Sequence, residues 1–206
     1  MEAGKTINRI TLLLASGLLC FVVMTSNVLA SGNDGVVVGD DGLYKQAWFI
    51  DSFLDLKEDH AEAAADGKGL IILFEQRGCP YCKELHKVNF AKNEIQDYIN
   101  KNFNVLQLDM WGSRAVTDFD GKEYEERDLA REWRVTFTPT VVFYSKDKSP
   151  IEDGESARLP GYFKPFHFLS MLEYVHEGKF EDQHFQRFLQ DKFKKMEAEG
   201  KKPEVW

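Results

Sequence analysis

The fold of this chain is decided by the stretch LIILFEQRGCPYC, residues 70–82. Its first five residues are all apolar, which predicts a buried strand. The strand leads into Cys79-Pro80-Tyr81-Cys82, and a helix is expected to begin there. A helix N-terminus favours a thiolate on Cys79, and Cys82 lies one turn further on, close enough to form a disulfide with it. The stretch therefore indicates a pair of reactive cysteines.

The first 30 residues predict an export signal. Lys5 and Arg9 form a positive N-terminal region, residues 10–24 carry no charge, and Ala30 suits cleavage before Ser31. The alternative is an uncleaved membrane anchor, but the apolar stretch is shorter than the roughly 20 residues that span a bilayer. We expect cleavage, which would also remove Cys20.

Residues 31–206 are 176 residues, a length that predicts one domain with a sizeable core. Removing Glu2, Lys5 and Arg9 leaves 24 basic and 33 acidic residues, a formal charge of −9. This balance argues against nucleic acid or an anionic membrane surface as a partner. Two remaining cysteines are too few for a disulfide scaffold.

Strand and helix patterns alternate along the chain, which predicts an α/β fold around a central sheet. Strands are expected at 70–74, 105–108, 140–144 and 157–159, and helices at about 44–65, 83–89, 93–99, 125–133 and 165–175. A final amphipathic helix is predicted by the apolar side chains of Phe185, Phe188, Leu189, Phe193 and Met196. We expect that helix to pack on the domain.

Residues 110–124 form an insertion after the strand that ends near residue 109. Asp120-Gly121 is a hairpin signal within it. The preceding strand is expected to run parallel to the strand before Cys79, so both end at one rim of the sheet. The insertion either helps to select a partner protein or is a passive surface loop, and Trp111 is interpreted as a packing residue.

The chain resembles the thioredoxin superfamily over most of residues 48–175. The resemblance rests on the strand, CxxC and helix at 70–89, on Thr138-Pro139 before a strand, and on a later strand with Gly161 before a helix. Residues 68–82 and 136–143, with 160–162, look most like the periplasmic SoxW-like thioredoxins of bacterial sulfur oxidation. The resemblance implies a three-layer α/β/α fold with a central mixed sheet, a core at about 44–176 and a C-terminal helical extension at 180–206.

The resemblance also implies how the site is built. Pro139 would be cis and lie against the disulfide, where the backbone of Thr138 binds an extended peptide. Pro80 and Tyr81 would line the same substrate site. No metal and no cofactor other than the Cys79–Cys82 dithiol is expected.

Cys79 is the expected nucleophile, and Cys82 resolves the mixed disulfide that it forms. Two alternatives are an inert structural disulfide and a zinc site with His86 as a third ligand. A zinc site usually needs about four ligands, and no second CxxC is present. Haem attachment through CxxCH is excluded because residue 83 is lysine.

Glu75 carries a further hypothesis. Thioredoxins have a buried aspartate six residues before the first cysteine, and that position here is Leu73. Residues 73 and 75 share a strand face, so Glu75 could accept the proton of Cys82. The sequence favours a simpler interpretation, a solvated glutamate at the strand end. His86 follows Cys82 by four residues and could tune the thiolates, but the sequence favours a hydrogen-bonded surface histidine.

Together these features predict an exported thiol–disulfide oxidoreductase that reduces disulfides or oxidised cysteines of a periplasmic partner protein. The resemblance implies a sulfur-oxidation carrier protein as the partner and electrons from a membrane thiol transporter of the CcdA type. A monomer is expected. The alternatives are a disulfide oxidase or isomerase, and a CxxC module that binds a metal or a protein without turnover.

Overall fold

The computed structural model describes Met1 and residues 36–202, and the elements below lie in the compact unit that spans Asn33–Trp206. The predicted export signal after Met1 and its cleavage site lie outside these residues. No helix in residues 36–202 combines the length and apolar character that a membrane crossing requires.

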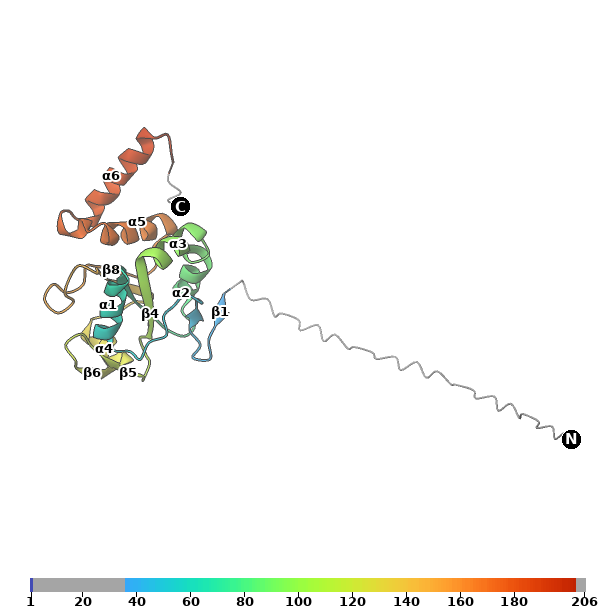
Figure 1. The fold of residues 1–206 in the computed structure, drawn as a ribbon. Helices are drawn as coiled ribbons and strands as arrows, with labels where there is room; N and C mark the ends of the chain where they lie inside the picture. Colours follow the sequence, from blue (N-terminus) through green and yellow to red (C-terminus); the bar gives the residue numbers. More distant parts are fainter. Residues whose placement is uncertain (2–35, 203–206) are drawn as a thin grey trace. The chain divides into compact units, whose positions relative to one another are not determined.

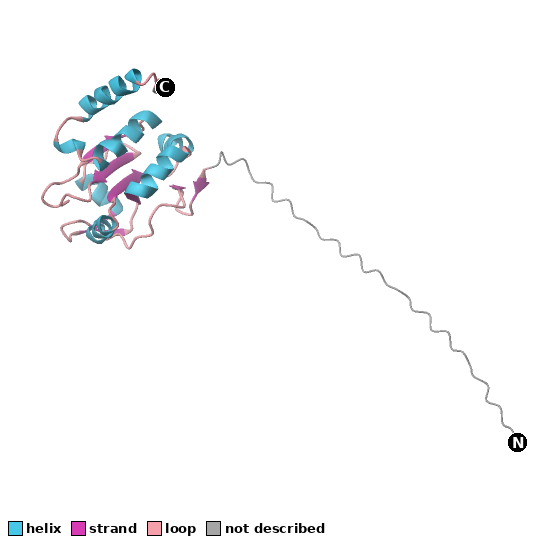
Figure 2. Ribbon diagram, turned by 45° about the horizontal axis from the view of Figure 1, so that its top comes forward, coloured by secondary structure: helices cyan, strands magenta, loops and turns pink. Residues whose placement is uncertain are grey.

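A four-stranded mixed sheet forms the centre of the fold (Figures 1 and 2). β3 pairs in parallel with β4, so that Glu75 is opposite Asp109, and antiparallel with β7, so that Phe74 is opposite Thr140. The strand order is β4 (Phe103–Asp109), β3 (Gly69–Glu75), β7 (Thr140–Tyr144), β8 (Ala157–Pro160). This is the central mixed sheet that the resemblance implied.

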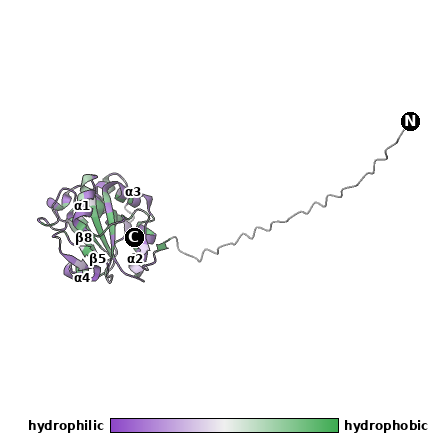
Figure 3. Ribbon diagram, turned by 60° about the horizontal axis from the view of Figure 1, so that its bottom comes forward, coloured by the Kyte–Doolittle hydropathy of each residue, from purple (hydrophilic) through white to green (hydrophobic). Residues whose placement is uncertain are grey.

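Side chains of β3 alternate between two hydrophobic cores, one on each face of the sheet. Ile71 and Leu73 pack with one core, and Leu70, Ile72 and Phe74 pack with the other. α2 (Pro80–Glu84) leads into the π-helix η1 (Leu85–Asn89), which covers the first core together with α3 (Asn93–Asn102) and α5 (Pro165–His176). The second is covered by α1 (Leu56–Ala65) and α4 (Glu126–Glu132). Hydrophobic residues accordingly concentrate on the central strands (Figure 3), and the three-layer α/β/α fold is confirmed.

The first helix is shorter than predicted. It begins at Leu56 because the carboxylate of Asp55 caps it, accepting hydrogen bonds from the backbone N–H groups of Lys57 and Glu58. The preceding chain is not helical, and Leu54 has a positive φ of 63°. The prediction of a helix from about residue 44 was therefore wrong.

Two small hairpins flank the sheet. β1 (Val37–Val38) pairs with β2 (Tyr44–Lys45) near the start of the described chain. In the insertion, β5 (Ala115–Thr117) pairs with β6 (Glu123–Glu125), and Gly121 supplies a positive φ of 85° in the connecting turn. The hairpin predicted from Asp120-Gly121 is confirmed.

The C-terminal extension consists of η2 (Lys179–Glu181) and α6 (Phe185–Ala198), which packs on α5. The rings of Phe166 and Phe193 are 4.8 Å apart, and those of Tyr174 and Phe188 are 5.5 Å apart. The apolar stripe of the predicted final helix thus packs on the domain, as expected.

Candidate functional site: a disulfide at a helix N-terminus

The two cysteines sit where β3 passes into α2. Cys79 is the N-cap of α2 and Pro80 occupies its first turn, a position where proline's missing N–H costs no hydrogen bond. The backbone N–H of Cys82 donates to Cys79 Sγ over 3.0 Å, and the two sulfurs form a disulfide. The solvent-exposed fraction is 3% for Cys79 and 0% for Cys82. The small opening to solvent is therefore on the predicted nucleophile.

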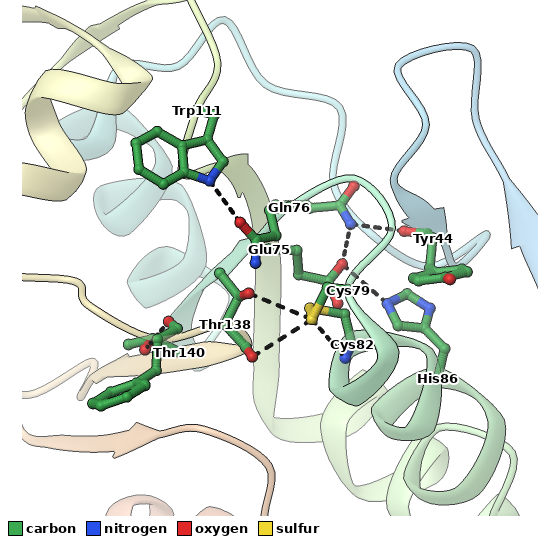
Figure 4. Close-up of a disulfide and its surroundings, with 11 residues drawn as sticks. Tyr44, Glu75, Gln76, Cys79, Cys82, His86, Trp111, Thr138 and Thr140 are labelled. Atoms are coloured by element: carbon green, nitrogen blue, oxygen red, sulfur yellow. Dashed lines mark hydrogen bonds and ion pairs between the residues drawn. A yellow bond between two sulfur atoms is a disulfide. The ribbon is translucent and has the colours of Figure 1, made fainter.

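Thr138, two residues before the start of β7, lies against this disulfide (Figure 4). The Thr138–Pro139 peptide bond is cis, as the resemblance implied. Thr138 Oγ1 lies 3.4 Å from Cys79 Sγ, and the carbonyl oxygen of Thr138 lies 3.5 Å from it. The backbone of Thr138 is thus adjacent to the more accessible cysteine.

Glu75, the last residue of β3, is completely buried beneath the site. Its Oε2 accepts a hydrogen bond from Gln107 Nε2 and lies 3.1 Å from His86 Nε2. Its Oε1 has no hydrogen-bond partner in the part of the chain that the structure describes. The favoured interpretation of a solvated glutamate was wrong, because the segment around Tyr44 and Gln46 and the π-helix η1 cover this end of the strand.

His86 is also buried, so its predicted surface position was wrong. Its imidazole ring contacts the aromatic rings of Tyr44, Phe49 and Phe90, whose centroids lie 5.1 to 5.7 Å from its own. Its Nδ1 lies 3.1 Å from Gln46 Nε2. When Gln46 donates to Nδ1, the imidazole is the neutral tautomer whose Nε2–H donates to Glu75.

Gln107 is a site residue that the sequence reasoning missed. It is buried on β4 in register with Leu73, and its amide nitrogen also donates to the carbonyl oxygen of Tyr44 over 2.7 Å. Lys45 Nζ donates to its oxygen over 2.7 Å. The signal was present: a glutamine interrupts the apolar strand pattern on the same face as Glu75.

Three exposed aromatic side chains surround the buried centre. Tyr81, Trp111 and Phe137 are 62%, 61% and 63% exposed. Trp111 Nε1 donates to Gln76 Oε1 over 2.6 Å, which places its ring beside the turn that precedes Cys79 (Figure 4). The interpretation of Trp111 as a packing residue was therefore wrong.

Within the described residues, no group of three or more histidine, cysteine, aspartate or glutamate side chains is arranged to hold a metal ion. His86 faces Glu75 rather than joining the cysteines as a third ligand. The chemistry that this geometry supports is disulfide exchange at Cys79.

Residues 56–176 match the family model of the thioredoxin-like domain, so the chain belongs to this family. Over 123 residues the chain is 25% identical to the thiol:disulfide interchange protein DsbD of Vibrio cholerae serotype O1. The match covers 60% of this chain and 18% of that relative, so the chain spans less than a fifth of its length.

Two solved structures are also similar. A thioredoxin-fold protein from Helicobacter pylori superposes with a TM-score of 0.50 at 24% identity, covering 66% of this chain and 93% of the other. The C-terminal domain of Neisseria meningitidis DsbD in the oxidised form has a TM-score of 0.43 at 21% identity, covering 63% and 99% of the two chains.

Proposed function

We propose that the protein is a thiol–disulfide oxidoreductase that reduces disulfides or oxidised cysteines in a partner protein. The observation that carries the proposal is the Cys79–Cys82 disulfide at the start of α2, with Thr138 beside Cys79. A helix N-terminus lowers the pKa of a thiol at that position, so the reduced form presents a nucleophile. Membership of the thioredoxin-like family supports the same assignment.

The reaction has two exchanges. The Cys79 thiolate attacks one sulfur of a partner disulfide, a mixed disulfide forms, and the other partner sulfur leaves as a thiolate. The Cys82 thiolate then attacks Cys79 Sγ, which releases the second partner thiolate and closes the Cys79–Cys82 disulfide. A dithiol donor must then return two electrons to the protein. Thr138, Pro139, Pro80 and Tyr81 form the surface on which the partner's chain lies during both exchanges.

Glu75 is proposed as the proton acceptor for Cys82. Cys82 is completely buried, so its thiol proton has no direct route to bulk water. His86 follows Cys82 by four residues on the same helical segment and lies 3.1 Å from the Glu75 carboxylate, so the carboxylate lies on the side of this segment that carries Cys82. The second carboxylate oxygen has no hydrogen-bond partner in residues 36–202 and keeps its lone pairs for a proton.

The same carboxylate supports the reducing direction. A strongly oxidising protein of this kind has its reduced form stabilised. A buried carboxylate near the cysteines disfavours a second negative charge there, so it does not stabilise a thiolate at Cys82. The disulfide form is then the favoured product, as a reductase requires.

The site of action and the partners rest on the sequence. The first 30 residues support export and cleavage, which leaves a single domain, residues 31–206, in the periplasm. The resemblance to the SoxW-like group supports a sulfur-oxidation carrier protein as the partner and a membrane thiol transporter of the CcdA type as the electron donor. A monomer is part of the proposal.

Turnover of insulin with dithiothreitol tests the activity. The unaltered protein is expected to accelerate precipitation of the reduced insulin chains, and Cys79→Ser is expected to abolish the acceleration. Cys82→Ser is expected to accumulate a mixed disulfide through Cys79, visible as a mass increase that a reductant reverses. An unaltered protein with no turnover, or full turnover by Cys79→Ser, would refute the proposal. Faster oxidation of reduced ribonuclease than reduction of insulin would instead assign an oxidase.

A further inference from the structure

The insertion that follows β4 is anchored by one buried carboxylate. Glu126, at the start of α4, accepts hydrogen bonds from the backbone N–H groups of Asp109 and Arg114, over 2.9 and 3.3 Å. The guanidinium of Arg114 donates to the same carboxylate over 2.5 Å, and this bond raises the pKa of Arg114. A Cβ at Gly112 would lie 2.0 Å from Glu126 Oε2, so the chain passes the carboxylate as closely as only glycine allows. The path of residues 110–114 is therefore fixed.

This fixed segment carries Trp111 to the rim of the site. Its backbone N–H donates to Asp109 Oδ1 over 3.0 Å, and its indole N–H donates to Gln76 Oε1 over 2.6 Å. The backbone carbonyl of Gln76 in turn accepts from the N–H of Cys79 over 3.3 Å. Both ends of the residue are held, yet 61% of it remains exposed to solvent.

The geometry around Cys79 restricts the direction from which a partner protein can approach. Cys79 is nearly buried and Thr138 lies against it, so a partner sulfur that reaches Cys79 brings its own chain across this rim. Residues beside the partner's cysteine then fall among Tyr81, Trp111 and Phe137. Exposed tryptophan and tyrosine side chains held rigid in this way are the residue types that contribute most to binding at protein interfaces.

We propose that Trp111 is a specificity-determining residue, selecting partner segments with a large apolar or aromatic side chain next to the reacting cysteine. The inference deepens the proposed function and rests on it. Trp111 supplies a flat apolar surface that is already ordered before binding, so the partner's side chain gains contact area without a cost for ordering the ring. The insertion is thus the part of this chain that selects the partner, and Glu126 keeps it in position.

Two synthetic peptide disulfides test this selection. Each is a homodimer linked by one cystine, with phenylalanine beside the cysteine in one peptide and glycine in the other. Reduced protein is mixed with each peptide under single-turnover conditions, and the second-order rate constants are compared. We expect a phenylalanine-to-glycine ratio of about ten for the unaltered protein, which is the order of effect that one aromatic contact gives. Trp111→Ala should lower the ratio to below about two, and Trp111→Phe should give an intermediate ratio.

Ile151→Ala is the matched control. Ile151 is equally exposed, at 60%, but lies in the loop after β7. Tyr144, the last residue of β7, pairs with Leu70 near the start of β3, at the end of the strands opposite to Cys79. Its ratio should equal that of the unaltered protein. An unchanged ratio in Trp111→Ala would overturn the inference, and so would an equal loss of both rates, which is what a purely structural role produces. Reduction of glutathione disulfide by the unaltered protein separates the two proposals. If the protein reduces neither the peptides nor glutathione disulfide, the proposed function is wrong. If it reduces glutathione disulfide but shows no preference between the peptides, only the inference about Trp111 is wrong.

Discussion

Replacement of Glu75 by glutamine is the sharpest perturbation of the buried centre. Glutamine has the same shape, and its amide oxygen can accept the hydrogen bonds that Gln107 and His86 give to Oε2. What the variant loses is the free oxygen that can take a proton. The fold should therefore persist while proton transfer from Cys82 slows.

The size of the effect follows from the burial of both groups. A positioned general base contributes about 10²- to 10⁴-fold, or about 2.7 to 5.4 kcal/mol in the activation free energy. Because Cys82 and Glu75 are both completely buried, bulk water cannot replace the carboxylate directly. We expect Glu75→Gln to slow the step in which Cys82 closes the disulfide by at least about 100-fold at pH 7.

Stopped-flow oxidation of the reduced protein between pH 5 and 10 measures this step. As the pH rises, a growing fraction of Cys82 ionises without a base in the protein, so the gap between the variant's rate and that of the unaltered protein should narrow. Glu152→Gln, an exposed acid in the loop after β7, is the matched control and should leave the profile unchanged. If the Glu75→Gln profile superposes on that of the unaltered protein, Glu75 is not the proton acceptor.

Three further predictions concern stability. Burial raises the pKa of Asp59 above its ordinary value of 3.8, so the folded state loses stability as the pH rises from that value through the raised pKa. In Asp59→Asn the side chain can still accept the hydrogen bond from Ser52. The variant should therefore have a larger free energy of unfolding than the unaltered protein at pH 7, and urea titrations should show no difference by pH 3. A gain that does not depend on pH would contradict burial of the Asp59 charge as its cause. Phe143→Ala empties a fully buried site on β7 and should cost about 3 to 5 kcal/mol in the same titrations, whereas a loss below about 1 kcal/mol would refute the packing described. Gly112→Ala should displace the Glu126 carboxylate and cost about 1 to 3 kcal/mol, with a change in the environment of Trp111 visible by fluorescence; an unaltered stability would show that the segment is not fixed.

The sheet, the CxxC and the insertion hairpin were accessible from the sequence because each has a local signal. An apolar run, a short cysteine spacing and an Asp-Gly turn specify structure within a few residues. The cis bond before Pro139 came from family resemblance, since spacing alone leaves a trans bond open.

The surroundings of Glu75 could not be predicted, because they depend on contacts between distant segments. The hairpin β1–β2 and the residues that follow it bring Tyr44 and Gln46 over Gln107 and His86, across about 40 to 60 positions of the chain. The same segment also accounts for the error in the predicted start of the first helix, which begins at Leu56 and not near residue 44. Its apolar side chains at Trp48 and Phe49 pack against the core without helical backbone.

Trp111 was misassigned for a related reason. A tryptophan in an irregular segment is usually a packing residue, and nothing in the local sequence shows that its ring stays outside. The ring of Trp111 is exposed because two contacts fix its position. The buried Glu126, 15 residues later in the chain, holds the segment that contains Trp111, and Gln76 accepts a hydrogen bond from the indole N–H.

The reduction potential of the Cys79–Cys82 pair tests the central claim most directly. The purified protein is equilibrated against glutathione and dithiothreitol buffers, and the fraction of disulfide is determined after thiol trapping. A value near about −270 mV, as in reducing thioredoxins, is the result that a reductase predicts. A value between about −180 and −120 mV would make the disulfide the reactive form and contradict the proposed direction of electron flow.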